Sequence, residues 1–204
     1  NQPIDRNDPL IVKAYYYRGM AALALYNDDA IHLLSSFNQA YPENPFRNQI
    51  NLEIGNYFFQ KEDFLGALPW YEEVQDDLLS PEEEEPFHFK KGYSYYQEGQ
   101  ESKALESFKH VKNSTGQYGT ISLYYYAHLN YKLGNLTESK SDFHRLKHIY
   151  EFTTIAPYYI VQINHKLGLY DSVIAYAPSV LDTADLGNYN DIIHLLGDSY
   201  FKLN

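Results

Sequence analysis

The stretch "GYSYYQEGQESKALESF", Gly92 to Phe108, contains the pattern that decides the fold. An aromatic-rich run ends at Gly99, and a second run follows in which Ala104 and Phe108 are four residues apart. That spacing places both apolar side chains on one helix face. Gly99 falls where the first helix must end in a left-handed turn, which glycine adopts readily because it has no Cβ. The stretch therefore predicts two helices joined by a tight turn.

The same pattern recurs along nearly the whole chain. Breaks after aromatic-rich helical runs occur at Asp28, Glu62, Gly99, Gly134 and Gly168, in steps of 34, 37, 35 and 34 residues. A fixed period of this length is typical of helical repeat proteins. The step of 37 contains "SPEEEEP", Ser80 to Pro86, which we interpret as a longer charged loop. Each period is then a helix, a tight turn, a second helix and a loop.

Two further sets of positions repeat with the breaks. A small or slender residue stands seven positions before each break: Ala21, Gly55, Gly92, Ala127 and Val161. Small side chains there let the two helices of a pair approach closely. A series with steps of four and three residues follows each break: Leu33, Phe37 and Ala40; Ala67, Tyr71 and Val74; Ala104, Phe108 and Val111; Ser139, Phe143 and Leu146; Val173, Ala177 and Val180. We expect this series on the buried face of each second helix.

These motifs resemble the tetratricopeptide repeat (TPR) family. The opening stretch has the family's glycine, Tyr95, turn glycine, alanine and Phe108 at matching spacing, and Pro45 matches the proline that often closes a repeat. Asp28 and Glu62 depart from the turn glycine, and Ser139 and Val173 replace the usual alanine. The resemblance covers nearly the whole chain and implies an all-α, right-handed α-solenoid of antiparallel helix pairs. It also implies that the outer face of each first helix lines a concave groove.

We expect a single domain over residues 1–204 with about five and a half repeats. Their expected bounds are 14–47, 48–84, 85–119, 120–153 and 154–189, with a half repeat over 190–204. In the last segment, "IHLLGDSYFKLN", Gly197 aligns with the small residues Gly55 and Gly92, and Tyr200 aligns with Tyr95. We therefore interpret this segment as a first helix without its partner. Its apolar residues Ile192, Ile193, Leu195, Leu196 and Phe201 favour a cut through a sixth repeat over a polar cap. We therefore expect the chain to be a fragment of a longer TPR array.

The groove should carry the binding residues. Positions ten, six, three and two residues before each break, read for the third to fifth repeats, concentrate tyrosine, histidine and lysine on this side. The predicted partner-binding residues are Tyr93, Tyr96, Tyr124, His128, Tyr131, Lys132, Tyr158, Gln162, His165 and Lys166. Tyrosine suits a surface that receives a partner, because it joins a large apolar ring to one polar tip. The alternative interpretation is that these aromatic residues pack between adjacent repeats.

Composition narrows the classes of function. The net charge is −11, which argues against nucleic acid or an anionic membrane surface as the main ligand. Cysteine is absent, and no run of apolar residues approaches the length of a membrane span. His144 and His148 have the spacing of a zinc pair, but Arg145 stands where the zinc-protease glutamate would be. We therefore predict no metal site, no cofactor and no enzymatic activity.

The leading hypothesis is a non-catalytic TPR scaffold that binds a protein or peptide segment in its concave groove. Lys132 and Lys166 favour an acidic ligand, because the charge of the groove governs local contacts. The alternative is an assembly module that self-associates or packs on other domains of a longer protein. High tyrosine content, absent cysteine and an acidic balance resemble TPR proteins of the bacterial cell envelope, which predicts a periplasmic location, with the cytoplasm as the alternative.

Overall fold

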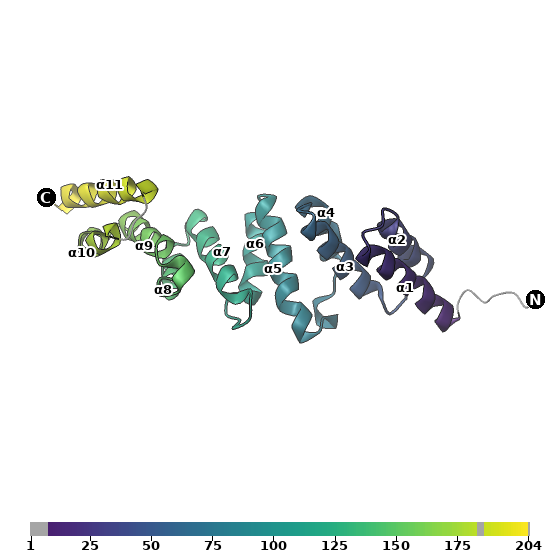
Figure 1. Cartoon of the computed structure of the whole chain (residues 1–204). Coiled ribbons are helices and arrows are strands. Elements are labelled where there is room, and N and C mark those ends of the chain that lie inside the picture. Colours follow the sequence, from purple (N-terminus) through teal and green to yellow (C-terminus); the bar gives the residue numbers. More distant parts are fainter. Residues whose placement is uncertain (1–7, 183–185, 204) are drawn as a thin grey trace, which may run out of the picture. The chain divides into compact units, whose positions relative to one another are not determined.

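The structure, a computed structural model, describes residues 8–182 and 186–203 as a series of helices without strands in that part of the chain (Figure 1). The α-helices are α1 (Pro9–Ala24), α2 (Ala30–Ala40), α3 (Arg47–Gln60), α4 (Phe64–Glu72), α5 (Pro81–Gln97), α6 (Glu101–Val111), α7 (Gly119–Lys132), α8 (Leu136–Leu146), α9 (Ile155–Lys166), α10 (Tyr170–Leu181) and α11 (Leu186–Leu203). Two 3-10 helices span Asp76–Leu78 and Tyr150–Phe152. The predicted all-α fold is confirmed.

The chain divides into two compact units, Asn1–Ala104 and Leu105–Asn204. The division falls within α6. In unit 1, the Nζ of Lys103 lies 2.9 Å from Oε1 of Glu72, whereas in unit 2 Phe108 stacks on Tyr125 with ring centroids 5.2 Å apart. Within the units, α1 packs on α2, α3 on α4, α7 on α8 and α9 on α10. The expected helix pairs are therefore present in each unit.

Four of the five predicted turns are confirmed by the backbone. Gly99, Gly134 and Gly168 have φ values of +69°, +83° and +69°, and Glu62 has φ +58°. The first turn was predicted at Asp28, but the left-handed residue is Tyr26 with φ +56°. The polar residues after Tyr26 resemble a turn, and a bulky residue rarely adopts positive φ, which is why the sequence placed the break two residues too late.

The other first-repeat assignments also differ from those predicted with the turn at Asp28. The small residue seven positions before Tyr26 is Gly19, which is buried, whereas Ala21 is exposed. The buried series of α2 is Ala30, Leu34 and Phe37, and the predicted Leu33 and Ala40 lie outside this buried face. Phe37 alone belongs to both series. The helix also starts before the predicted repeat, since α1 begins at Pro9.

The small column works by steric fit between the two helices of a pair. A Cβ at Gly19 would lie 2.4 Å from Cδ2 of Leu34, and a Cβ at Gly55 would lie 2.6 Å from the ring of Tyr71. These distances leave no room for a side chain on the first helix. In α9 and α10 the sizes are reversed, because the larger Val161 shares a core cluster with the smaller Ala177. The hairpins thus keep the sum of the two volumes rather than a fixed residue type.

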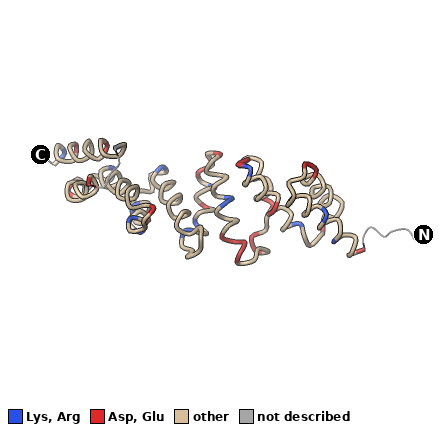
Figure 2. The backbone as a smooth tube through the Cα atoms, in the orientation of Figure 1, with Lys and Arg blue, Asp and Glu red and all other residues tan. Residues whose placement is uncertain are grey.

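The acidic segment from Ser80 to Pro86 was predicted as a loop, but it forms the N-cap and the first turns of α5. α5 begins at Pro81, and the backbone N–H of Ser80 donates to Oε2 of Glu83 at 3.0 Å in a capping box. Glu82 to Glu84 occupy the first turn, where carboxylates offset the positive end of the helix dipole. The hydrogen bond from the backbone of Ser80 lowers the pKa of Glu83. Figure 2 shows acidic residues gathered around this helix start.

Within the described residues, none of the helices combines the length and the apolar character that a membrane crossing requires.

Candidate functional site

The predicted groove residues of unit 1 lie in an aromatic cluster on α5. The ring of Tyr93 is 5.4 Å from that of Phe64 and 6.0 Å from that of Phe59, in edge-to-face arrangements. Tyr96 lies 6.3 Å from Tyr93, and both rings are half-buried. Edge-to-face rings stabilise a cluster through their quadrupoles as well as through burial. In unit 1, Tyr93 therefore packs against α3 and α4, and Tyr96 lies beside it on α5.

In unit 2, α7, α9 and α11 bring four of the predicted residues to one cavity. Tyr131 from α7 and Gln162, His165 and Lys166 from α9 line it, with Asp191, His194 and Leu195 from α11 on the opposite side. We call this cavity the α9 hollow. Its volume is about 200 Å³. It is the place in unit 2 where the predicted binding residues converge.

The walls of the α9 hollow are held by contacts between neighbouring first helices. Tyr131 Oη donates to Oε1 of Gln162 at 2.6 Å, and Lys166 Nζ lies 4.1 Å from the centroid of the Tyr131 ring. The second contact is a cation–π interaction, which holds the ammonium group at the mouth of the hollow. His165 Nε2 lies 2.7 Å from Oδ2 of Asp198 on α11. The hollow is thus lined by side chains that already have defined positions.

Three of the other predicted residues support unit 2 rather than line its hollow. The ring of Tyr124 packs 5.2 Å from Phe152, and His128 Nδ1 lies 2.9 Å from Oη of Tyr159. Tyr158 Oη donates to Oδ2 of Asp191 at 2.9 Å. The contacts of His128 and Tyr158 join one repeat to the next, as the alternative interpretation of the aromatic residues described, whereas Tyr124 and Phe152 belong to the same predicted repeat. Lys132 is exposed at the end of α7 and does not line the hollow.

The sequence did not predict the α11 side of the hollow. Asp191, His194 and Asp198 were not among the candidate residues, and they bring two carboxylates to a surface that was expected to be basic. Extending the same columns to the last helix would have found two of them. If a sixth break is placed at Asn204, 36 residues after Gly168, His194 and Asp198 stand ten and six residues before it. The repeat period was therefore the sequence signal that could have predicted His194 and Asp198.

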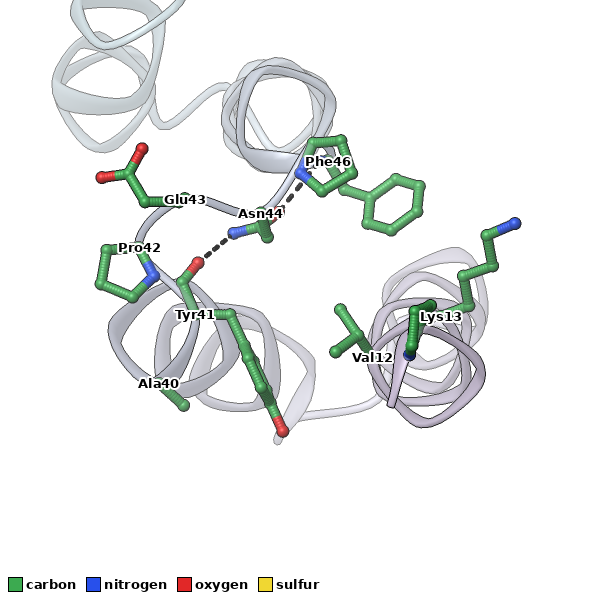
Figure 3. A pocket seen from close by; sticks show the side chains of 10 residues that line it. Val12, Lys13, Ala40, Tyr41, Pro42, Glu43, Asn44 and Phe46 are labelled. Carbon is green, nitrogen blue, oxygen red and sulfur yellow. Dashed lines mark hydrogen bonds between the residues drawn. The ribbon is translucent and has the colours of Figure 1, made fainter. Parts of the chain in front are cut away.

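A second cavity lies in unit 1, away from every predicted residue. Figure 3 shows Val12 of α1 pointing toward Tyr41, while Lys13 points away from it, and the loop before α3 carries Pro42 and Phe46. Its volume is about 430 Å³. Asn44 shapes this loop, because its Nδ2 donates to the carbonyl of Tyr41 at 2.6 Å and its Oδ1 accepts from Phe46 N at 2.9 Å. The cavity wall is mainly apolar.

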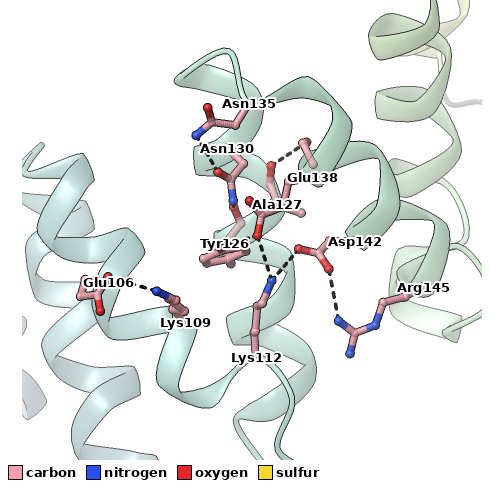
Figure 4. A network of polar contacts seen from close by, with 11 residues as sticks. Glu106, Lys109, Lys112, Tyr126, Ala127, Asn130, Asn135, Glu138, Asp142 and Arg145 are labelled. Atoms are coloured by element: carbon pink, nitrogen blue, oxygen red, sulfur yellow. Dashed lines mark hydrogen bonds and ion pairs between the residues drawn. The ribbon is translucent and has the colours of Figure 1, made fainter.

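A buried polar network stabilises the α7–α8 hairpin (Figure 4). Lys112 Nζ lies 3.0 Å from Oδ2 of Asp142, with side-chain exposures of 12% and 6%, and Arg145 contacts the other oxygen at 3.2 Å. Tyr126 Oη donates to Oε1 of Glu138 at 2.6 Å. Burial and this hydrogen bond raise the pKa of Tyr126 to about 12, and the same bond lowers the pKa of Glu138. Each charged group has a partner, so we assign the network to stability rather than to chemistry.

Comparison with known proteins supports the fold. No family model and no curated protein matches the sequence. Among solved structures, a MamA protein superposes with a TM-score of 0.58 at 18% identity, over 77% of this chain and 82% of that one. A tetratricopeptide repeat protein from Parabacteroides merdae ATCC 43184 superposes with a TM-score of 0.56 at 15% identity, over 94% of this chain and 73% of that one.

The chain has a TPR fold. In a TPR solenoid each repeat packs only on its neighbours, so contacts recur about one period apart. The polar contacts of unit 2 follow this rule, because Tyr131 and Gln162 are 31 residues apart and His165 and Asp198 are 33 apart. The first helices of the TPR hairpins α7/α8 and α9/α10 therefore contact each other through side chains that line the α9 hollow.

Proposed function

We propose that this protein is a non-catalytic TPR scaffold that binds a protein or peptide segment at the α9 hollow of unit 2. The observation that carries the proposal is the convergence of Tyr131, Gln162, His165 and Lys166 on one cavity with residues of α11. Helical repeat proteins use the surface formed by successive helices to bind extended partners. The TPR fold supports the class of function, and the α9 hollow supports its location.

The size and chemistry of the hollow favour a single side chain of a larger ligand. Small-molecule pockets are usually about 300–1,000 Å³, so a cavity of about 200 Å³ is small for a free metabolite. Lys166 and His194 offer cationic or hydrogen-bonding groups, and the ring of Tyr131 offers an apolar wall. Asp191 and Asp198 are already engaged by Tyr158 and His165. We therefore propose a segment that places an acidic side chain beside Lys166.

A charge reversal tests this assignment. Lys166→Glu places a carboxylate at the mouth of the hollow, and Lys109→Glu makes the same charge change on the exposed face of α6. Partners would be captured on the wild-type chain, identified, and titrated by calorimetry against all three proteins. We expect Lys166→Glu to weaken binding at least about tenfold, because a like charge opposes an acidic ligand at close range. Lys109→Glu should stay within about twofold.

The outcome that contradicts the proposal is equally concrete. If a captured partner binds the Lys166→Glu and Lys109→Glu variants with the same affinity while circular dichroism shows both to be folded, the hollow is not the binding site. A test at Lys166 is cleaner than truncation of Tyr124, because Tyr124 packs in the core cluster of unit 2 and its loss would change stability.

A further inference from the structure

The last helix of unit 2 carries an apolar face that faces away from α9 and α10. Tyr189, Ile193, Gly197, Tyr200 and Phe201 recur at helical spacing, and the four side chains are 40%, 46%, 51% and 77% exposed in chain order. Gly197 lies in the middle of the set and is exposed as well. We call these five residues the α11 face. Ile192 of the same helix is fully buried against α9 and α10.

Three of the five positions of the α11 face, those of Ile193, Gly197 and Tyr200, are buried on α7 and α9, where a second helix follows. One period earlier, on α9, the positions of Ile193, Gly197 and Tyr200 are occupied by Pro157, Val161 and Asn164, which are all buried. One further period back, on α7, they are occupied by Leu123, Ala127 and Asn130, which are buried as well. In those hairpins the covering elements include α10 and α8. The α11 face is therefore a first-helix surface of the kind that a second helix covers.

Gly197 adds a steric argument to this equivalence. A Cβ at Gly197 would meet no described atom within 4 Å, whereas a Cβ at Gly19 or Gly55 would collide with Leu34 or Tyr71. Leu34 and Tyr71 are large side chains on second helices that lie directly over a glycine. The space over Gly197 is thus open in the described part of the chain, at a position where two other first helices lie under a large side chain of the second helix.

We propose that the α11 face binds an amphipathic helix that packs on it as the second helix of a hairpin. The partner helix carries a leucine or an aromatic residue over Gly197, a small residue one turn before it, and an aliphatic residue three positions after it. This is the series that Ala104, Phe108 and Val111 form on α6. Continuity with the hairpin interface of the preceding repeats carries the choice of occupant. The surface is separate from the α9 hollow and extends the proposed function to a second class of ligand.

A peptide that carries this series is a direct probe. The probe is a fluorescent peptide of residues 99–113, with a side-chain cross-link on its polar face because isolated helices of this length are marginal in water. The matched control peptide has Phe108→Ala. The full chain is compared with Gly197→Leu, which fills the space over the glycine, and with Lys202→Leu, which places a leucine at another exposed position of α11. Binding is followed by fluorescence anisotropy.

We expect the wild-type chain and Lys202→Leu to bind the Phe108 peptide with affinities within about twofold of each other. Gly197→Leu should weaken this binding at least about tenfold, and the Phe108→Ala peptide should bind at least about tenfold more weakly, since each change removes the fit of a large side chain over Gly197. Gly197→Leu should not unfold the chain, because the site is open and leucine is a better helix former than glycine. Thermal melting by circular dichroism checks this.

Three results would overturn the proposal. The first is the absence of saturable binding of the Phe108 peptide to the wild-type chain, and the second is equal binding to wild type and Gly197→Leu. The third is a dimer in sedimentation velocity that Gly197→Leu abolishes while the peptide does not bind, since the face would then be an interface between two copies. Binding at the α9 hollow is measured with Lys166→Glu, so failure of one proposal is distinguishable from failure of the other.

Discussion

The hairpins α3/α4 in unit 1 and α7/α8 in unit 2 have the same fold, but different interactions hold their helices together. In α3/α4, Gly55 lies under the ring of Tyr71, which is fully buried. In α7/α8, a hydrogen bond of 2.8 Å from Ser139 Oγ to the Ala127 carbonyl joins the two helices, and Asp142 of α8 is buried with Lys112. One hairpin relies on steric fit, and the other adds buried polar bonds to it.

The difference shows which features the repeat requires. The α9/α10 hairpin places Val161 against the smaller Ala177, so even the direction of the size difference is free. What the three hairpins share is one smaller and one larger buried side chain at the paired positions, Gly55 with Tyr71, Ala127 with Phe143 and Val161 with Ala177. The buried charges of α7/α8 are a local addition, and their removal should affect only the hairpin that contains them.

The largest effect is expected from breaking the charge pair. Asp142→Asn keeps the shape of the side chain but leaves the ammonium group of Lys112, only 12% exposed, with Glu138 at 3.5 Å as its remaining anionic contact in the network. We expect the free energy of unfolding to fall by about 3 kcal/mol, as is usual when one partner of a buried ion pair is removed. Urea denaturation followed by circular dichroism measures it.

The control for this pair is another carboxylate-to-amide change in the same unit. Glu106 and Lys109 are both more than half exposed, with 3.9 Å between their charged atoms, so Glu106→Gln should cost less than about 1 kcal/mol. If the two variants lose the same free energy, the network of Figure 4 is a surface feature without a structural role.

The next effect comes from overfilling the steric hairpin. Gly55→Val would place its Cβ 2.6 Å from ring atoms of Tyr71, so the two side chains would collide. We expect this collision to lower the free energy of unfolding by about 2–3 kcal/mol. Trp70 is the only tryptophan in the chain and lies on α4, so its fluorescence reports the unfolding of this hairpin.

A second substitution turns this prediction into a test of volume exchange. The double variant Gly55→Val/Tyr71→Ala recreates the sizes of Val161 and Ala177. It should be more stable than the sum of the two single variants predicts, by at least about 1 kcal/mol in a double-mutant cycle. Additive effects would show that the two positions do not compensate for each other.

The smallest effect is the pH dependence of the Tyr126–Glu138 bond. The hydrogen bond from Tyr126 lowers the pKa of Glu138 below its usual 4.5 in the folded state. The stabilisation by Glu138 is therefore complete above that pH and is lost as the pH falls through the folded pKa. The difference in unfolding free energy between wild type and Glu138→Gln should be at most about 1 kcal/mol at pH 7 and should shrink in acid.

Urea denaturation at a series of pH values measures this difference. Glu151→Gln is the control, because it makes the same carboxylate-to-amide change at an exposed position. A difference for Glu138→Gln that persists undiminished well below pH 4 would show that the bond does not depend on the charged carboxylate.

The repeat could be predicted because its signals are local. Gly99, Gly134 and Gly168 mark turns that a residue with a Cβ adopts only at a cost, so the type of residue reports the backbone conformation. At the first turn a tyrosine takes that role, and no residue-type rule finds it. Tyr26 has tertiary contacts around it, since its Oη donates to Oε1 of Gln60 at 2.9 Å and its ring lies 5.9 Å from that of Tyr57.

The candidate site was predicted only in part. The columns placed Tyr131, Gln162, His165 and Lys166 on one side of the solenoid, because helical periodicity decides which face a residue occupies. They could not separate these residues from Tyr124 and His128, which contact Phe152 and Tyr159 instead. Whether a ring on that face lines a cavity or packs between repeats depends on the side chains of the next repeat.

By itself, the sequence determined the period, the helical hairpins, four of the five turns and the face that each column occupies. These depend on interactions within about one turn of helix or on the conformational freedom of single residues. Only the tertiary structure decided that Asp191 of α11 lines the α9 hollow. It also decided that the ring of Tyr71 covers Gly55, whereas no described atom covers Gly197. The physical reason is that side-chain contacts between helices are set by what each neighbour supplies, and a glycine in the sequence does not show whether a tyrosine lies above it.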